Sequence, residues 1–328
     1  MNDGWQKHYK DALAGLNPPI TTFFAPDFSN SPTSPADKYN TFPVVDGLFN
    51  WDSAWPAVSE GRVNVSSEVD QEYLAAAKAA GKPYMMRPFS YTSFQSSLQI
   101  DFFAAMSNLQ FKHLDSTQNW YRRGELNIAQ RMAQVLAAQP NMLEFQTWND
   151  GGESSYIGNV WDDAIEGSPA HGYIDGFSHA GWQNILTPFI SAFKAGATDI
   201  SAVVPLNGAA ATGAFWYHPI LTTATCASDS LGKPSGWNNA EDVVNVAVLL
   251  SVEAAGATIN VYSGGDMIGS VIGGRGLSSW SIAGLKTGTV KVEVIERGGG
   301  STLLSASGGM DVAADAAICN FNEYVVGL

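Results

Sequence analysis

EFQTWNDGGESSYIG, residues 144–158, takes the chain from a short apolar strand pattern directly into a polar loop. The loop carries two carboxyl side chains, Asp150 and Glu153, close in sequence to the aromatic rings of Trp148 and Tyr156. In folds that alternate strands and helices, functional side chains gather on the loops that follow the strands. We therefore expect the fold and its chemistry to centre on this stretch.

Two carboxyl groups among aromatic rings match the needs of one reaction class. Cleavage of a glycosidic bond requires one carboxyl to protonate the leaving oxygen and another to take a proton from water, while flat rings bind sugars. Residues 149–152, Asn-Asp-Gly-Gly, also form a turn whatever their function. A solvated turn without chemistry stays open as the alternative.

The size, hydrophobic content and net charge of the chain limit the kinds of molecule that it can bind. The chain has 328 residues, of which 45% are hydrophobic, so it has room for a sizeable core and for two domains. Its formal net charge is −14 at pH 7. Such a surface repels nucleic acid and anionic membranes but not a neutral polymer, so we expect neither nucleic acid nor membrane as a partner.

The chain shows no motif for metal or cofactor chemistry. The five histidines are scattered without an HExxH pair, and the two cysteines, Cys226 and Cys319, cannot form a zinc cluster or a CxxC motif. We expect no metal and no cofactor. The cysteines are compatible with a long-range disulfide in a secreted domain or with two buried thiols.

Strand and helix patterns alternate up to about residue 220, which favours a parallel sheet with helical crossovers. Strands are expected at residues 21–25, 44–49, 84–86 and 142–148. Helices are expected at residues 68–79, 126–138 and 182–194. Ser67 can cap the first of these helices, and Gly81 ends it.

The composition changes near residues 226–239, a segment rich in Gly, Ser, Pro and Asn. Beyond it, apolar and polar residues alternate in short runs between Gly-rich turns, which predicts antiparallel strands. They are expected at residues 243–250, 258–262, 280–282, 290–295 and 320–326. The pattern indicates a small β-sandwich.

Two other motifs lack the context that their chemistry requires. Residues 176–180, Gly-Phe-Ser-His-Ala, lack the last glycine and the preceding strand of a nucleophile elbow, so Ser178 is interpreted as a helix cap. Gly274-Arg275-Gly276 lies among strand patterns and lacks the third glycine of a dinucleotide site. A serine hydrolase is therefore a distant alternative.

Several blocks together resemble glycoside hydrolase family 71, the fungal α-1,3-glucanases also called mutanases. The strongest is WNDGGESSYIG at residues 148–158, which is similar to the family's WND-x-GES-x-YIG segment. Further blocks follow in the same order: DGLFNWD at 46–52 with Trp55-Pro56, YMM at 84–86, NWYRRGE at 119–125, HAGW at 179–182 and FWYHP at 215–219. The resemblance spans most of the chain.

This resemblance implies a (β/α)8 TIM-type barrel with an appended β-domain, and hydrolysis of α-1,3-glucan by an inverting mechanism. It implies Asp150 and Glu153 as catalytic carboxyls. The substrate-binding residues expected with them are Trp148, Asn149, Tyr156, Trp51, Asp52 and Asp46. Trp51 and Trp148 are the rings expected in the cleft, and core packing is the alternative for Trp51, Trp55, Trp120 and Tyr156.

The division of roles between the two carboxyls has two versions. In the first, Glu153 is the acid and Asp150 the base. In the second, one of the pair is the acid, the other tunes its pKa, and a different carboxylate is the base. Asp46, Asp52 and Asp27 are the candidates for that base.

The chain departs from the family in three ways. Only four strand patterns precede the β-domain, so residues 1–225 are expected to be the C-terminal part of the barrel, residues 226–239 a linker and residues 240–328 the β-sandwich. Residues 92–115 look inserted. Gly151 and Ser155 stand where the family often has Tyr and His, which removes two substrate contacts.

The expected fold class is therefore α/β, a partial barrel followed by a sandwich, and the expected function is that of a glycoside hydrolase acting on α-1,3-glucan. The alternative is a truncated, non-catalytic remnant that binds glucan or is inactive, or a chain that needs the missing barrel half. The resemblance implies an extracellular or cell-wall location. The first residues, MNDGWQKHYKDALAG, lack the features of a signal peptide, and no transmembrane run is expected.

Overall fold

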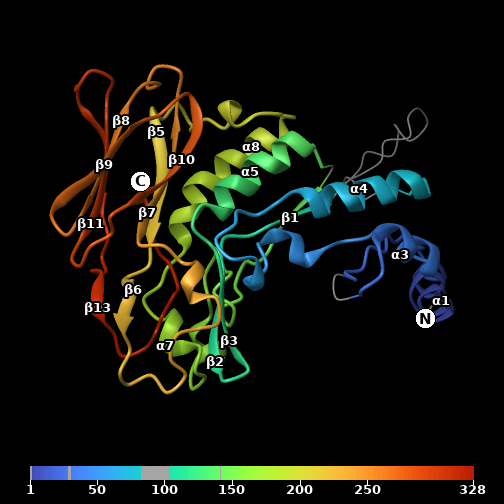
Figure 1. The fold of residues 1–328 in the computed structure, drawn as a ribbon. Helices are drawn as coiled ribbons and strands as arrows, with labels where there is room; N and C mark the ends of the chain where they lie inside the picture. The colour runs from blue at the N-terminus through green and yellow to red at the C-terminus, as the bar shows by residue number, and fades with distance from the viewer. Residues whose placement is uncertain (1, 29–30, 83–102, 141) are drawn as a thin grey trace. The chain divides into compact units, whose positions relative to one another are not determined.

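The structure, a computed structural model, describes residues 2–28, 31–82, 103–140 and 142–328 (Figure 1). Two compact units divide the chain. The first consists of Met1–Ala54, Ser66–Met106 and Ala138–Phe145. The second consists of Trp55–Val65, Ser107–Ala137 and Gln146–Leu328.

The first unit is mainly helical in its described residues. Its elements are α1 (Asn2–Trp5), η1 (Gln6–Lys10), α2 (Asp11–Ala14), α3 (Pro35–Thr41), η2 (Trp51–Ala54), α4 (Glu68–Ala80), β1 (Phe103–Met106) and β4 (Met142–Phe145). Helices α3 and α4 pack together, and Lys38 Nζ donates to the Tyr73 hydroxyl at 2.7 Å. Strands β1 and β4 pair in parallel. Gly81 ends α4 in the left-handed conformation, as predicted.

Two predicted strands of this unit are not formed. Residues 21–25 and 44–49 run side by side, joined by an isolated parallel bridge between Asp27 and Phe49. The Asp46 carboxylate accepts from the Phe24 N–H at 2.8 Å, so a side chain satisfies a backbone donor that a ladder would use. The predicted strand at 84–86 lies outside the described residues, as does much of the apparent insertion at 92–115.

The cap predicted for α4 is also corrected. The Ser67 side chain makes no capping hydrogen bond. The hydroxyl of Ser66, one residue earlier, accepts from the Glu68 N–H at 3.0 Å. The helix therefore starts where it was predicted to start, with a different residue satisfying its first free donor.

The second unit begins with short elements around a hairpin. These are η3 (Val58–Glu60), β2 (Gln110–Asp115), β3 (Gln118–Arg122), α5 (Asn127–Ala138), α6 (Asp162–Ile165), α7 (His171–Ile174), η4 (Ala180–Trp182), α8 (Gln183–Lys194) and η5 (Ile200–Ala202). The β2–β3 hairpin was not predicted. Helices α5 and α8 start within one residue of their predicted bounds and end at them.

The rest of the second unit is mostly strand. Its elements are β5 (Ala211–Tyr217), β6 (Ile220–Thr225), η6 (Trp237–Asn239), β7 (Val243–Leu250), β8 (Thr258–Ser263), β9 (Asp266–Ile272), β10 (Gly276–Ala283), β11 (Val290–Ile295), β12 (Thr302–Ser307), β13 (Ala313–Asp315) and β14 (Tyr324–Gly327). Two antiparallel sheets, β10-β7-β5-β14 and β12-β11-β8-β9, face each other in Figure 1. Strands β6 and β13 form a separate parallel pair.

The predicted antiparallel sheets thus form, and alternation explains their core. Strand β7 is buried along its whole length, whereas β8 and β11 bury every second residue. Phe215, Val246, Val261 and Val292 belong to the shared apolar core. Helix α8 packs on β5 and β7 (Figure 1). Strand β5 pairs with β7, although β5 lies before residue 226, where the barrel was expected to end. The domain boundaries expected from the sequence remain a prediction.

The two cysteines form a disulfide. Cys226 follows β6, and Cys319 lies 93 residues later, before β14. Of the two alternatives that the sequence left open, the structure has the disulfide.

The fold class is mixed helix and strand with antiparallel sheets, and it is consistent with an α/β protein.

Glu125 is a buried carboxyl of the second unit, directly after the hairpin. Arg123 Nε lies 3.4 Å from its Oε2 atom, and the Glu241 N–H donates to Oε1 at 3.1 Å. Burial raises the pKa of Glu125 to about 7; the Arg123 charge opposes this shift, and the Glu241 charge adds to it. In the unfolded chain the same carboxyl titrates near its ordinary value of 4.5.

We expect Glu125→Gln to flatten the pH dependence of stability. The native state holds the Glu125 proton up to about pH 7, so the stability from this group is present below pH 4.5 and is lost as the pH rises through 7. The loss amounts to about 3 kcal/mol at most. Urea unfolding at pH 5 and pH 8 measures it. Parallel pH profiles for the variant and the unsubstituted chain would contradict the prediction, and the exposed Glu166→Gln is the control.

Candidate active site

The loop after β4 closes on itself through short hydrogen bonds. The Thr147 N–H donates to the Ser155 carbonyl at 2.8 Å, and the Ile157 N–H donates to the Thr147 carbonyl at 3.1 Å. Within the loop, the Asp150 Oδ1 atom accepts from the Glu153 N–H at 3.1 Å. The predicted strand at 142–148 therefore ends at Phe145, because the next residues pair within the loop instead of with β1.

Strand β2 holds the carboxyl group of Glu153. Gln110 Nε2 donates to Glu153 Oε2 at 2.5 Å, and Lys112 Nζ lies 3.3 Å from Glu153 Oε1. The backbone is fixed as well, since the Phe111 N–H donates to the Glu153 carbonyl at 2.9 Å. The Glu153 side chain keeps 23% of its surface exposed. It is therefore oriented by three contacts and still accessible to a substrate.

Asp150 lies in a different environment from Glu153. Burial raises the pKa of Asp150, and the nearby Glu153 charge raises it further. The Lys112 ammonium and backbone N–H groups of the loop oppose this shift. A carboxyl whose pKa is raised keeps its proton at higher pH, which is the property of a proton donor.

The aromatic residues of the motif divide into exposed and buried rings. Trp148 is 59% exposed, and a Cβ added to Gly158 would lie 2.3 Å from its ring, so the indole rests against the Gly158 backbone. Tyr156 is buried, stacks on His179 with ring centroids 3.9 Å apart, and donates its hydroxyl proton to the Phe177 carbonyl at 2.5 Å. The Trp148 ring is thus open to solvent, whereas the Tyr156 ring is packed in the interior.

Other predicted contact residues lie in different places. Asn149 is exposed beside Trp148 in the same loop. Asp46, Trp51 and Asp52 belong to the first unit, and Asp150 and Glu153 to the second. Asp46 forms a salt bridge with Lys10, at 2.5 Å between Oδ1 and Nζ. Of the predicted site residues, Asp150 and Glu153 are the pair that the structure joins by a hydrogen bond.

Gly151 fits its surroundings because it has no side chain. A Cβ at this position would lie 2.8 Å from Ile174 Cδ1 and 3.0 Å from a Val160 methyl group. Ser155 is buried within the loop. Gly151 and Ser155, the two positions that differ from the family pattern, are therefore both closely packed.

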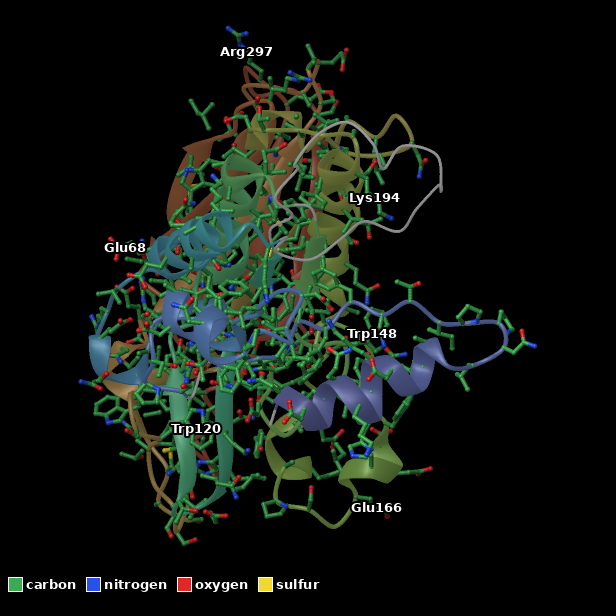
Figure 2. The ribbon with its side chains drawn as sticks, turned by 90° about the vertical axis from the view of Figure 1, so that its right-hand side faces the viewer. Glu68, Trp120, Trp148, Glu166, Lys194 and Arg297 are labelled. Carbon is green, nitrogen blue, oxygen red and sulfur yellow. A yellow bond between two sulfur atoms is a disulfide. The ribbon has the colours of Figure 1, made fainter. Side chains whose placement is uncertain are left out.

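Sequence reasoning missed Gln110 and Lys112. They lie about 40 residues before Glu153, in a segment interpreted as part of an insertion. Polar and apolar residues alternate only over Gln110-Phe111-Lys112, and this short alternation is the signal for a strand that the segment offers. Figure 2 labels Trp120 on this hairpin and Trp148 on the loop after β4.

Among the described residues, no cluster of three or more His, Cys, Asp or Glu side chains could hold a metal ion. Within the same residues, no helix is long and apolar enough to cross a membrane.

The loop after β4 thus presents two carboxyl groups and an exposed indole, groups that cleavage of a glycosidic bond can use. The chain belongs to glycosyl hydrolase family 71, whose family model matches residues 2–328. No solved structure matches the chain significantly.

Named relatives come from two fungi. The chain is 30% identical over 326 residues to the glucan endo-1,3-alpha-glucosidase agn1 of Schizosaccharomyces pombe, covering 99% of this chain and 66% of the relative. It is 30% identical over 289 residues to the ascus wall endo-1,3-alpha-glucanase of the same yeast, covering 86% and 58%. A mutanase of Penicillium rubens is 28% identical over 296 residues, covering 85% and 56%. The chain thus spans about 56–66% of the length of these relatives.

Proposed function

We propose that this chain is a glycoside hydrolase that cleaves α-1,3-linked glucan with Asp150 and Glu153. The observation that carries the proposal is the Glu153 carboxyl, held by Gln110 and Lys112 beside a second carboxyl with a raised pKa. Family membership and the names of the three relatives support the same substrate class.

The surroundings of the two carboxyls favour a division of roles opposite to the first version from the sequence. Asp150, with its raised pKa, protonates the glycosidic oxygen as the bond to the sugar C1 breaks. Glu153 accepts hydrogen bonds from an amide and an ammonium group, which suits a carboxylate. It takes a proton from the water that attacks C1 from the opposite side of the ring, so the configuration inverts.

The remainder of the proposal concerns fold and location. Strands β1 and β4 pair in parallel, as neighbouring strands of a (β/α)8 barrel do, and helix α5 lies between them in the chain; this supports our inference of a partial barrel ahead of the sandwich. The disulfide fits an oxidising compartment, and the relatives include an ascus wall enzyme. Both support action outside the cell, at a glucan-containing wall.

The test is release of reducing ends from insoluble α-1,3-glucan, with α-1,4-glucan and β-1,3-glucan as controls. Release from the first polymer alone supports the proposal.

The second candidate function is glucan binding without cleavage. It is favoured by the exposed Trp148 ring, which needs no carboxyl to bind sugar. Sedimentation of the chain with α-1,3-glucan, without release of reducing ends, would establish it instead.

Lys112→Met is expected to change the pH profile of cleavage. Lys112 lowers the pKa of Asp150, so its removal raises that pKa and lets Asp150 keep its proton at higher pH. The basic limb of the kcat profile should move to higher pH, and kcat should fall about tenfold because Glu153 loses a charged partner.

Lys286→Met is the matched control for Lys112→Met. It removes another lysine–carboxylate pair, Lys286 with Asp266 at 2.7 Å, from the sandwich. Its pH profile should equal that of the unsubstituted chain. A basic limb that stays in place, or moves to lower pH, in Lys112→Met would rule out Asp150 as the proton donor.

A further inference from the structure

One face of the β2–β3 hairpin carries three long polar side chains and an indole at the end away from the turn. In the register of the two strands, Gln110 is opposite Arg122, and Lys112 is opposite Trp120. Side chains directly opposite in an antiparallel pair lie on the same face, with Cβ atoms about 5 Å apart. Phe111 and Tyr121 take the other face and are fully buried. We call the first set, Gln110, Lys112, Trp120 and Arg122, the polar hairpin face.

The two strands of this face meet different features of the second unit. Gln110 and Lys112 bind the Glu153 carboxyl, and Lys112 Nζ also lies 5.2 Å from the centre of the Trp120 ring. Arg122 lines a cavity of about 510 Å³, together with residues of segments 58–61 and 235–239. We call this cavity the Arg122 pocket. Gln110 of β2 binds Glu153, and Arg122 is its direct neighbour on β3. Adjacent strands of the hairpin therefore contact Glu153 and the Arg122 pocket.

The walls of the Arg122 pocket are held by hydrogen bonds between segments far apart in sequence. Tyr121 N–H donates to the Ser235 carbonyl at 2.8 Å, and Asn239 Nδ2 donates to the Val58 carbonyl at 3.0 Å. Gly236 has φ of +84°, and a Cβ there would lie 2.5 Å from the Tyr121 carbonyl, so only glycine allows this approach. These contacts hold the walls of the cavity together.

The lining of the pocket selects the chemistry of a ligand. It offers a guanidinium, asparagine side chains and serine hydroxyls, and no carboxylate is among the described residues that line it. Its volume lies within the range of about 300–1,000 Å³ that small-molecule sites have. A protein of net charge −14 attracts anions poorly, whereas a neutral ligand dense in hydroxyl groups meets a donor or acceptor on each wall.

We propose that the Arg122 pocket is a binding subsite for glucosyl units of the polymer, beside the bond on which Asp150 and Glu153 act. The inference rests on the proposed function. Sugar rings that leave the carboxyl pair along the polar hairpin face would pass the half-buried Trp120 ring and enter the pocket at Arg122. The subsite would therefore favour long oligomers over short ones.

The test measures binding of α-1,3-linked glucose oligomers of increasing length by calorimetry. The host is Glu153→Gln, which keeps the size of the side chain and is expected to slow cleavage by about 10²–10⁴. Asn238→Ala is added because the contact that holds this residue, from Arg62 Nε, uses its backbone carbonyl and survives the change. Affinity for the longest oligomer should fall about fivefold.

A second variant and a control make the test decisive. Ser59→Trp places a large ring at an exposed position of the lining and should lower the same affinity on the order of tenfold. Thr223→Ala, exposed on β6, should leave it unchanged.

Two outcomes separate the subsite from the proposed function. If the unsubstituted chain cleaves α-1,3-glucan but neither pocket variant weakens oligomer binding, the subsite is wrong and the proposed function stands. If the unsubstituted chain neither cleaves glucan nor binds oligomers, the proposed function fails and the subsite with it. Inorganic phosphate that binds the host, and is lost in Asn238→Ala while oligomer affinity is retained, would assign the pocket to anions and overturn the inference.

Discussion

Glu153→Gln is expected to lower the rate of α-1,3-glucan hydrolysis by about 10²–10⁴, the usual contribution of a positioned proton-transfer group. The amide has the size of the carboxyl but cannot take a proton from water. In the unsubstituted chain, Gln110 and Lys112 bind the two different carboxyl oxygens of Glu153. The amide of the variant offers them only one acceptor oxygen. The measurement is reducing-end release from insoluble α-1,3-glucan by the variant and by the unsubstituted chain, prepared identically.

The control for this change is Glu166→Gln, an exposed glutamate of the same unit. It should cleave glucan at the unsubstituted rate, and the thermal unfolding of all variants should coincide. Hydrolysis by Glu153→Gln within about threefold of the control would contradict a proton-transfer role for Glu153. Asp150→Asn belongs in the same series: equal losses in both variants are expected if the two carboxyls act as the acid and base pair.

Local patterns predicted the elements whose contacts are regular. Strands β7 and β11 have their predicted bounds, because β7 is an apolar run interrupted only by Asn245 and β11 alternates strictly between buried and half-buried residues. Helix α4 keeps its predicted start and ends one residue later than predicted, at Ala80, with Gly81 as its cap. These are features that a residue and its near neighbours determine.

Features that depend on distant residues could not be predicted in this way. Residues 21–25 have a strand composition, but the Asp46 side chain, more than twenty residues away, takes the Phe24 N–H. The pair Asp150 and Glu153 could be predicted from its spacing after a strand. Its supports, Gln110 and Lys112, could not, because their approach to Glu153 depends on a hairpin that packs against the loop from another part of the chain.

The second large effect is expected for removal of the disulfide. Replacing Cys226 and Cys319 with serine should lower the free energy of unfolding by about 4–5 kcal/mol, because the bond closes a loop of 93 residues in the unfolded chain. Urea unfolding followed by tryptophan fluorescence measures the change. Eight of the ten tryptophans belong to the second unit, which also holds both cysteines, so the signal reports this unit.

The disulfide also stabilises the part of the site that the hairpin supplies. Cys226 begins a segment in which Asp229 Oδ2 lies 2.9 Å from His113 Nε2 of β2 and accepts from the Cys319 N–H at 2.8 Å. Loosening this segment therefore loosens β2, which holds Glu153 through Lys112, and cleavage should be lost at a lower temperature than in the unsubstituted chain. Ser228→Ala, next to the bond and exposed, should retain both stability and activity. A loss below about 1 kcal/mol in the double variant would show that the bond constrains the unfolded chain far less than its loop length requires.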